Sequence, residues 1–210
     1  MFSYLRKGSA ASRLQAANLP IDLLKRARFF HASGISQAIS HDACDAVDAA
    51  IDAAKGAGAV FVYDSNLRLR LWPLARAREV ITATVALADY FLLSLEDAEA
   101  LCGLKEPDAI VDWCHRAGAP VVALKLGADG VIGSDSKRRE RVEGYKVDCV
   151  DATGAGDCFA GALLARMAAG DDFWQGLRFA NAAAALTTTG YGAVAPLPRP
   201  EAVRQLLNRG

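Results

Sequence analysis

The sequence predicts an α/β fold in which helices cover both faces of a doubly wound, mostly parallel sheet. Two observations carry this prediction. Short apolar runs alternate with alanine-rich segments of helical spacing, and several of those runs are continuous. A continuous apolar run is typical of a strand buried on both faces, as strands of parallel sheets are. The length of 210 residues predicts a single domain over residues 1–210.

The first predicted elements alternate between strand and helix. A strand at 28–33 precedes an alanine-rich helix at 42–55, and an apolar run at 59–64 predicts a second strand. A helix at 74–87 and a strand at 90–94 repeat the pattern. This repetition indicates parallel strands joined by helical crossovers.

The second half of the chain adds a hairpin and closes with helices. Helices at 96–101 and 109–116 precede a strand at 121–125. Two short strands at 130–134 and 139–143 predict an antiparallel hairpin whose charged turn is a solvated loop. Three predicted helices close the chain. The first follows the glycine-rich turn at 154–156, the second occupies 173–188 with Asp172 as cap, and the third occupies 200–207.

Polar residues and glycines follow the ends of the predicted strands. They are Ser33 and Gly34, Asp64 to Asn66, Ser94, and Lys125 to Gly127. Open α/β sheets bind ligands beyond the carboxyl ends of their strands. The sequence therefore predicts one active-site rim at these positions.

Composition excludes several classes of partner. Lys plus Arg and Asp plus Glu both number 24, so no net field recruits nucleic acid or membrane. Five scattered cysteines without a Cys-x-x-Cys pair favour reduced thiols, and the three histidines lack ligand spacing. The start lacks the apolar core of a signal peptide, and no run reaches membrane-span length. We expect a soluble cytoplasmic protein.

The run DATGAGDCFAG from Asp151 to Gly161 is the most informative stretch of the chain. A Gly-Ala-Gly turn leads into a helix whose first-turn amides attract anions, phosphate above all. Asp157 in that first turn would repel a phosphate, so its presence there indicates a chemical task. Accepting a proton from an attacking hydroxyl is a task that fits. The alternative is an acid that only complements the helix dipole. Neither a Walker run nor a third dinucleotide-binding glycine is present.

This run resembles the second signature of the ribokinase-like (PfkB) carbohydrate kinases. Stretches at 2–12, 31–35, 64–68 and 125–130 resemble further blocks of that family, in order, and are most similar to its 2-keto-3-deoxygluconate kinases. The resemblance extends along nearly all of the chain. It begins part-way into the family's sequence, so we expect that the lid, the first sheet strands and a glycine-rich substrate loop are absent from this N-terminally truncated chain. An uncovered sheet edge then favours a homo-oligomer.

The resemblance implies a role for each matching residue. Asp157 matches the catalytic base and also contacts substrate. The implied nucleotide-binding residues are Asn66, Ser94, Lys125, Gly127, Gly130, Gly154, Ala155, Gly156 and Asn181. The implied substrate-binding residues are Tyr4, Arg6, Ile35 and Arg68. Asp97 could act on a metal through water, although Ser94 to Asp97 departs from the family's Asn-x-x-Glu. Gly130 fits a plain hairpin turn equally well.

The function implied is ATP-dependent phosphorylation of a keto-deoxy sugar acid, 2-keto-3-deoxygluconate above all, with Mg²⁺ and a monovalent cation as cofactors. Arg6 and Arg68 would offer two guanidinium groups to the acid. Two alternatives stay open: a kinase for a neutral sugar such as ribose or fructose, and a catalytically incomplete nucleotide-binding module. An NAD-linked oxidoreductase is disfavoured by the missing third glycine.

Overall fold

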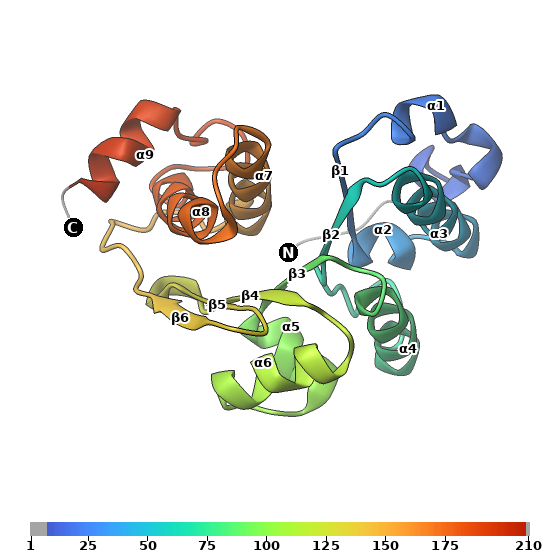
Figure 1. Ribbon diagram of the computed structural model, residues 1–210, viewed down its shortest axis with the longest axis horizontal. Helices are drawn as coiled ribbons and strands as arrows, with labels where there is room; N and C mark the ends of the chain where they lie inside the picture. The colour runs from blue at the N-terminus through green and yellow to red at the C-terminus, as the bar shows by residue number, and fades with distance from the viewer. Residues whose placement is uncertain (1–7, 209–210) are drawn as a thin grey trace. The chain divides into compact units, whose positions relative to one another are not determined.

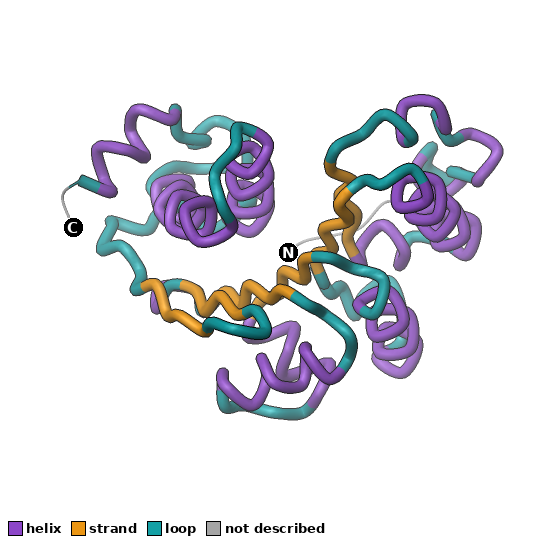
Figure 2. The backbone as a smooth tube through the Cα atoms, viewed as in Figure 1, coloured by secondary structure: helices purple, strands orange, loops and turns teal. Residues whose placement is uncertain are grey.

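The computed structural model describes residues 8–208. The chain forms two compact units, Met1–Val121 and Val122–Gly210. Both units combine strands with helices (Figures 1 and 2). Among the described residues, no helix has both the length and the apolar character needed to cross a membrane.

Three parallel strands form the centre of the first unit (Figure 1). They are β1 (Phe29–Ser33), β2 (Val60–Asp64) and β3 (Tyr90–Ser94), each within one residue of its predicted bounds. Phe29 pairs with Val60 and Val62 with Tyr90, so the carboxyl ends of all three strands lie at one edge. The predicted parallel pattern is confirmed in this unit.

Helices and short turns surround these strands. They are η1 (Ala11–Arg13), η2 (Ala16–Asn18), α1 (Ile21–Leu24), α2 (Gly34–Ala38), α3 (His41–Gly56), α4 (Leu74–Val85), α5 (Leu95–Cys102) and α6 (Pro107–Arg116). The sequence predicted α3 to α6 but not the short elements before them. One of those, α2, is held by tertiary contacts, since its buried Gln37 accepts a 2.6 Å hydrogen bond from the Tyr63 hydroxyl. A five-residue helix has too few periodic positions to be recognised from sequence.

The second unit begins with three antiparallel strands. Strand β4 (Val121–Lys125) pairs with β5 (Val131–Ser134), which pairs in turn with β6 (Arg139–Val142). The turn between β5 and β6 is closed by the Asp135 carboxylate, which accepts two 2.7 Å hydrogen bonds from main-chain amides. The predicted hairpin and its exposed charged turn are confirmed.

Helices α7 (Ala155–Ala168), α8 (Phe173–Thr187) and α9 (Pro200–Leu207) complete the second unit. Helix α8 begins with a capping box in which Asp172 and Gln175 bond each other's main-chain amides, as the predicted cap requires. It packs on β5 where Gly133 has no side chain, because a Cβ there would lie 2.5 Å from Leu177. Helix α7 packs along α8 (Figure 1).

Candidate functional site

The N-terminus of α7 has no side-chain cap. Gly154 is its N-cap residue, with a φ of 81°, and the first intrahelical hydrogen bond runs from Cys158 N–H to Gly154 O at 2.8 Å. The Ala155 amide bonds the Ala152 carbonyl at 3.2 Å, whereas the Gly156 and Asp157 amides precede any intrahelical acceptor. They therefore carry partial positive charge at a place that suits an anion.

Gly154 is required here for two separate reasons. Its φ lies in the left-handed region, which is costly for residues with a Cβ. A Cβ on this residue would also lie 2.8 Å from the Ala193 methyl carbon. Gly156 differs, because a Cβ there would meet only Lys125 Nζ, at an ordinary 3.6 Å.

The Lys125 ammonium lies beside this helix end. It extends from the carboxyl end of β4 and lies 6.0 Å from the centre of the Phe159 ring on α7. The 3.6 Å distance to the Cβ position of residue 156 places it against the first turn. A fixed cation and a helix N-terminus thus act on the same point, and both favour negative charge.

Asp157 lies in the first turn of α7 and is exposed. Together with Gly154, it lines an apolar cavity of about 550 Å³ whose other walls come from α7, α8 and the residues around α9. Its neighbour Cys158 is half-buried, and burial raises the pKa of that thiol. An exposed carboxylate beside an anion site fits a group that accepts a proton there, and it also fits a dipole-complementing acid.

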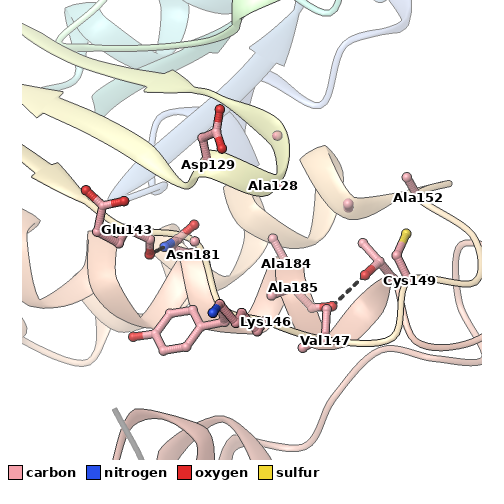
Figure 3. Close-up of a pocket in the computed structure, with 15 residues that line it drawn as sticks. Ala128, Asp129, Glu143, Lys146, Val147, Cys149, Ala152, Asn181, Ala184 and Ala185 are labelled. Carbon is pink, nitrogen blue, oxygen red and sulfur yellow. Dashed lines mark hydrogen bonds between the residues drawn. The ribbon is translucent and has the colours of Figure 1, made fainter.

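A second cavity, of about 440 Å³, is lined by Ala152 and Ala155 from the same stretch of chain (Figure 3). Its volume lies within the usual range for small-molecule pockets. Small apolar side chains form much of its wall, with a few polar groups among them. The wall includes Gly127, Ala128, Asp129, Glu143, Tyr145, Lys146, Val147, Cys149, Ala152, Ala155, Asn181, Ala184, Ala185 and Thr188.

Asn181 is the buried polar side chain of this cavity. It is 8% exposed, and its amide nitrogen donates a 2.9 Å hydrogen bond to the Glu143 carbonyl (Figure 3). A carbonyl oxygen can only accept, so this bond fixes which end of the amide is the nitrogen. The amide oxygen is the end that this bond does not use.

Gly127 and Gly130 belong to the loop after β4, and the structure separates their roles. Gly127 lines the 440 Å³ cavity, whereas Gly130 is not among its wall residues. Gly130 has a φ of 96°, and a Cβ there would lie 2.1 Å from the Val142 carbonyl oxygen. Close backbone packing therefore explains Gly130, in line with the hairpin interpretation.

The sequence prediction missed the extended segment after β6. Glu143, Tyr145 and Cys149 from this segment line the cavity. Burial raises the pKa of the Tyr145 phenol, so its hydroxyl keeps its proton at neutral pH. No residue pattern marked this segment, because it forms neither a helix nor a strand.

Asp151 was also missed as an individual residue, although it begins the motif. Its carboxylate accepts hydrogen bonds from the Thr153 hydroxyl at 2.6 Å and from the amides of Thr153 and Gly192, both at 2.9 Å. The Thr153 hydroxyl, then the Gly192 and Thr153 amides, hold the pKa of Asp151 below its usual value. Asp151 thus remains a carboxylate at neutral pH.

The remaining predicted residues belong to the first unit and follow the strand ends there. Ser94 is the N-cap of α5, and its hydroxyl accepts a 3.1 Å bond from the Asp97 amide. The Asp97 carboxylate accepts bonds from the Ser65 hydroxyl at 2.7 Å and the Leu67 amide at 2.9 Å. Asn66 lies in the loop that these bonds hold, with a φ of 32°. Ser94 and Asp97 thus shape the loop after β2.

The predicted substrate residues are only partly described. Ile35 lies half-buried on α2, and Arg68 donates a 2.8 Å hydrogen bond to the neighbouring Leu67 carbonyl. Tyr4 and Arg6 lie outside the described residues. Within residues 8–208, no group of three or more His, Cys, Asp or Glu side chains is placed to hold a metal ion.

A family model described as "pfkB family carbohydrate kinase" matches residues 2–200 of the chain. The chain belongs to the pfkB family of carbohydrate kinases. Fructokinase-1 of Zea mays is 36% identical over 99% of this chain and 67% of its own length. The 2-dehydro-3-deoxygluconokinase of Bacillus subtilis is 33% identical over 98% of this chain and 64% of its own length. In one Arabidopsis thaliana relative, the chain spans only 56% of the relative's length.

Solved structures of pfkB and ribokinase relatives share the fold. An E. coli protein assigned as ribokinase II, solved with ATP and Mg²⁺, matches with a TM-score of 0.91 at 29% identity, over 100% of this chain and 68% of its own. A Vibrio cholerae fructokinase with fructose, ADP and potassium bound matches with a TM-score of 0.87 at 28% identity, over 95% of this chain and 66% of its own. The predicted ribokinase-like α/β class is confirmed.

The two glycines of the motif should respond differently to alanine. We expect Gly154→Ala to lower the free energy of unfolding by about 1–2 kcal/mol or more, because of its left-handed φ and the Ala193 contact. Gly156→Ala should leave stability unchanged or slightly raised, since its Cβ meets only ordinary contact. Urea unfolding measures both. Equal destabilisation by the two variants would contradict this geometry.

Proposed function

We propose that this chain carries the site for ATP-dependent phosphoryl transfer to the hydroxyl of a sugar. One observation carries the proposal: the uncapped N-terminus of α7, with Lys125 against it, lies at the end of a pocket of nucleotide size. Phosphoryl transfer depends on positioning and on positive potential around the moving group. These residues supply both.

The pocket indicates how a nucleotide would lie. Ala184, Ala185 and Val147 offer an apolar slot for a base, with Asn181 as its polar group. Ala152 and Ala155 line the same pocket at the start of α7. A nucleotide with its base at Asn181 would therefore direct its phosphates to the amides of Gly154 to Asp157 and to Lys125. Gly127 would contact it from the loop after β4.

Asp157 is the proposed catalytic base. It adjoins the amides that would hold the transferred phosphoryl group, and it is exposed to an incoming hydroxyl. A carboxylate oxygen of Asp157 would take the hydroxyl proton as the hydroxyl oxygen bonds phosphorus and the bond to the leaving phosphate breaks. Amides and ammonium would stabilise the negative charge on the phosphoryl oxygens.

The proposed cofactors are Mg²⁺ and a monovalent cation, as in the relatives solved with Mg²⁺ and with potassium. Magnesium usually keeps several waters and relies on substrate phosphates plus one or two carboxylates, so a cluster of three protein ligands is not needed. Asp97 already accepts two hydrogen bonds, which suits contact through a metal-bound water better than direct coordination. Bound Mg²⁺ would supply charge neutralisation at the phosphates.

The proposed substrate is a keto-deoxy sugar acid, 2-keto-3-deoxygluconate. Arg68 and Arg6 are the cations offered to its carboxylate, with Tyr4 and Ile35 as further contacts. The Bacillus subtilis relative is named as a kinase of this sugar acid. Fructose is the second candidate, because several relatives of comparable identity are named fructokinases.

The alternative function is nucleotide binding without catalysis. About a third of each relative's length lies outside the part that matches this chain. If that part supplied the cover that excludes water from the sugar, this chain would bind ATP without releasing ADP. Measuring ATP binding separately from sugar-dependent ADP release distinguishes the two functions.

Replacing the proposed base separates chemistry from binding. We expect Asp157→Asn to lower sugar-dependent ADP release by at least about 100-fold, the usual contribution of a general base. ATP affinity, measured by calorimetry, should change little or rise, because the variant removes a negative charge near the phosphates. Asp148→Asn, an exposed carboxylate change outside both cavities, is the matched control. Undiminished turnover in Asp157→Asn would refute the role of base.

A sugar panel tests the substrate class. We expect kcat/KM for 2-keto-3-deoxygluconate to exceed that for fructose and ribose, since a guanidinium–carboxylate contact favours the acid. Arg68→Lys should lower the value for the acid more than for fructose, because lysine lacks the paired donors. A higher kcat/KM for fructose would assign the neutral sugar instead.

The orientation of Asn181 leads to a prediction about the base. Its oxygen is an acceptor, which matches the amino group of adenine and opposes the carbonyl that hypoxanthine has at the same position. We expect ATP to bind roughly tenfold more tightly than ITP, the effect of one unpaired polar contact. Asn181→Ala should remove that preference. Thr188→Ala, whose hydroxyl bonds the Ala185 carbonyl, should keep it. Equal wild-type affinities would contradict this arrangement.

A further inference from the structure

Gln37 is a polar side chain in the core of the first unit. It is 2% exposed, and it connects α2 to three other elements. Its amide nitrogen donates to the Asp48 carboxylate of α3 at 3.2 Å and to the Thr84 hydroxyl of α4 at 3.0 Å. Its amide oxygen accepts the 2.6 Å bond from the Tyr63 hydroxyl of β2. One side chain thus ties a short helix to a strand and two long helices.

Each of these hydrogen bonds has one possible direction. A carboxylate only accepts, so the Asp48 contact fixes which end of the amide is the nitrogen. The Thr84 hydroxyl donates to the Val80 carbonyl at 2.9 Å, which leaves its oxygen to accept. Burial holds the pKa of Tyr63 well above its usual value, so its hydroxyl keeps the proton that it donates. A buried network whose members are all satisfied favours one arrangement of the elements that it joins.

Helix α2 depends on tertiary contacts for its position. It has five residues and no side-chain cap, so it has little stability of its own. Its first residue, Gly34, packs on the loop after β2, because a Cβ there would lie 2.2 Å from the Ser65 carbonyl oxygen. That loop continues with Asn66 and Arg68. The place of α2 therefore affects where these two residues lie.

We propose that Gln37 is a positioning residue, which fixes α2 against the loop after β2 and thereby holds Arg68 in place for the sugar. The inference rests on the proposed function, in which Arg68 and Ile35 of α2 contact the substrate. Because Gln37 is buried, it acts through the packing of Gly34 on Ser65.

The alternative is that Gln37 only fills the core. Amide side chains are seldom fully buried, and a leucine would fill such a space without the cost of removing an amide from water. What an apolar side chain lacks is the three directed hydrogen bonds. A leucine at this position would keep much of the packing and lose the bonds, so it separates the two roles.

Two variants distinguish the bonds from the packing. Gln37→Leu leaves the buried Tyr63 hydroxyl without its acceptor, so it should lower the urea midpoint of unfolding. Adding Tyr63→Phe removes that hydroxyl, and the ring keeps its stacking on Phe91, with 6.0 Å between the ring centres. Replacing both partners of a buried hydrogen bond by apolar groups is nearly neutral, so the double variant should recover most of the midpoint. It does not recover the bonds.

The KM for the sugar is the functional measurement, made with 2-keto-3-deoxygluconate, or with fructose if the wild-type protein prefers it. We expect the single and the double variant both to raise this KM by about tenfold or more, because a small displacement of a binding group weakens its contact strongly. Adenosine affinity should stay within about twofold of the wild type, since the pocket proposed for the base belongs to the second unit.

Thr187→Val is the matched control, because it also removes a buried hydroxyl, one that bonds the Ala183 carbonyl of α8. It should leave the sugar KM within about twofold of the wild type. A KM that returned to the wild-type value in the double variant would overturn the proposal, because packing alone would then hold the loop. An unchanged KM in Gln37→Leu would overturn it as well.

Amide exchange tests the proposal without a ligand. We expect the double variant to speed hydrogen exchange in α2 and also at Ser65 and Leu67 of the loop, whose amides are both hydrogen-bonded. Ala119, whose amide bonds the Cys114 carbonyl elsewhere in the unit, should keep its wild-type rate. Faster exchange in α2 alone would contradict the proposal, because the loop would then not depend on that helix. If the wild-type protein phosphorylated no sugar, the proposed function would fail, and this exchange measurement would still decide the role of Gln37.

Discussion

The N-terminus of α7, which has no side-chain cap, is the constraint on which the rest of the site depends. A helix start needs partners for its first amides, and Gly154 provides no side chain to serve as one. Lys125 adds a cation at the same point. The helix end and the lysine ammonium both favour negative charge at this point. The neighbouring Asp157 opposes that preference, and this is the reason for proposing it as the base that takes the hydroxyl proton.

The position of that helix end is set by packing within the second unit. Helix α7 approaches α8 closely at Gly176, where a Cβ would lie 2.9 Å from the Leu163 side chain. Helix α8 in turn lies on β5 through Gly133. Helix α8 also carries Asn181. Strand β4, which pairs with β5, carries Lys125 at its carboxyl end. Both ends of the proposed nucleotide site therefore belong to one closely packed stack, which limits the reorganisation needed on binding.

The sequence predicted the strands and long helices well because their patterns are local. Continuous apolar runs marked β2, β3 and β4, and Asp172 marked the start of α8. The glycine-rich motif likewise indicated an anion site at α7. Gly130 remained ambiguous, since its cause is a backbone approach from Val142 that no local pattern reveals. The cavity wall after β6 and the bond from Gly192 to Asp151 were missed for the same reason: both join segments distant in sequence.

The two carboxylates of the motif have different roles in the proposed site. Asp151 and Asp157 are two carboxylates close to a site that attracts anions, yet their surroundings differ. Asp151 accepts three hydrogen bonds, so much of its negative charge is compensated by donors within the protein. Asp157 is exposed and lines the apolar cavity. One carboxylate thus satisfies the protein's own amides, and the other is the group that we propose to meet the substrate hydroxyl.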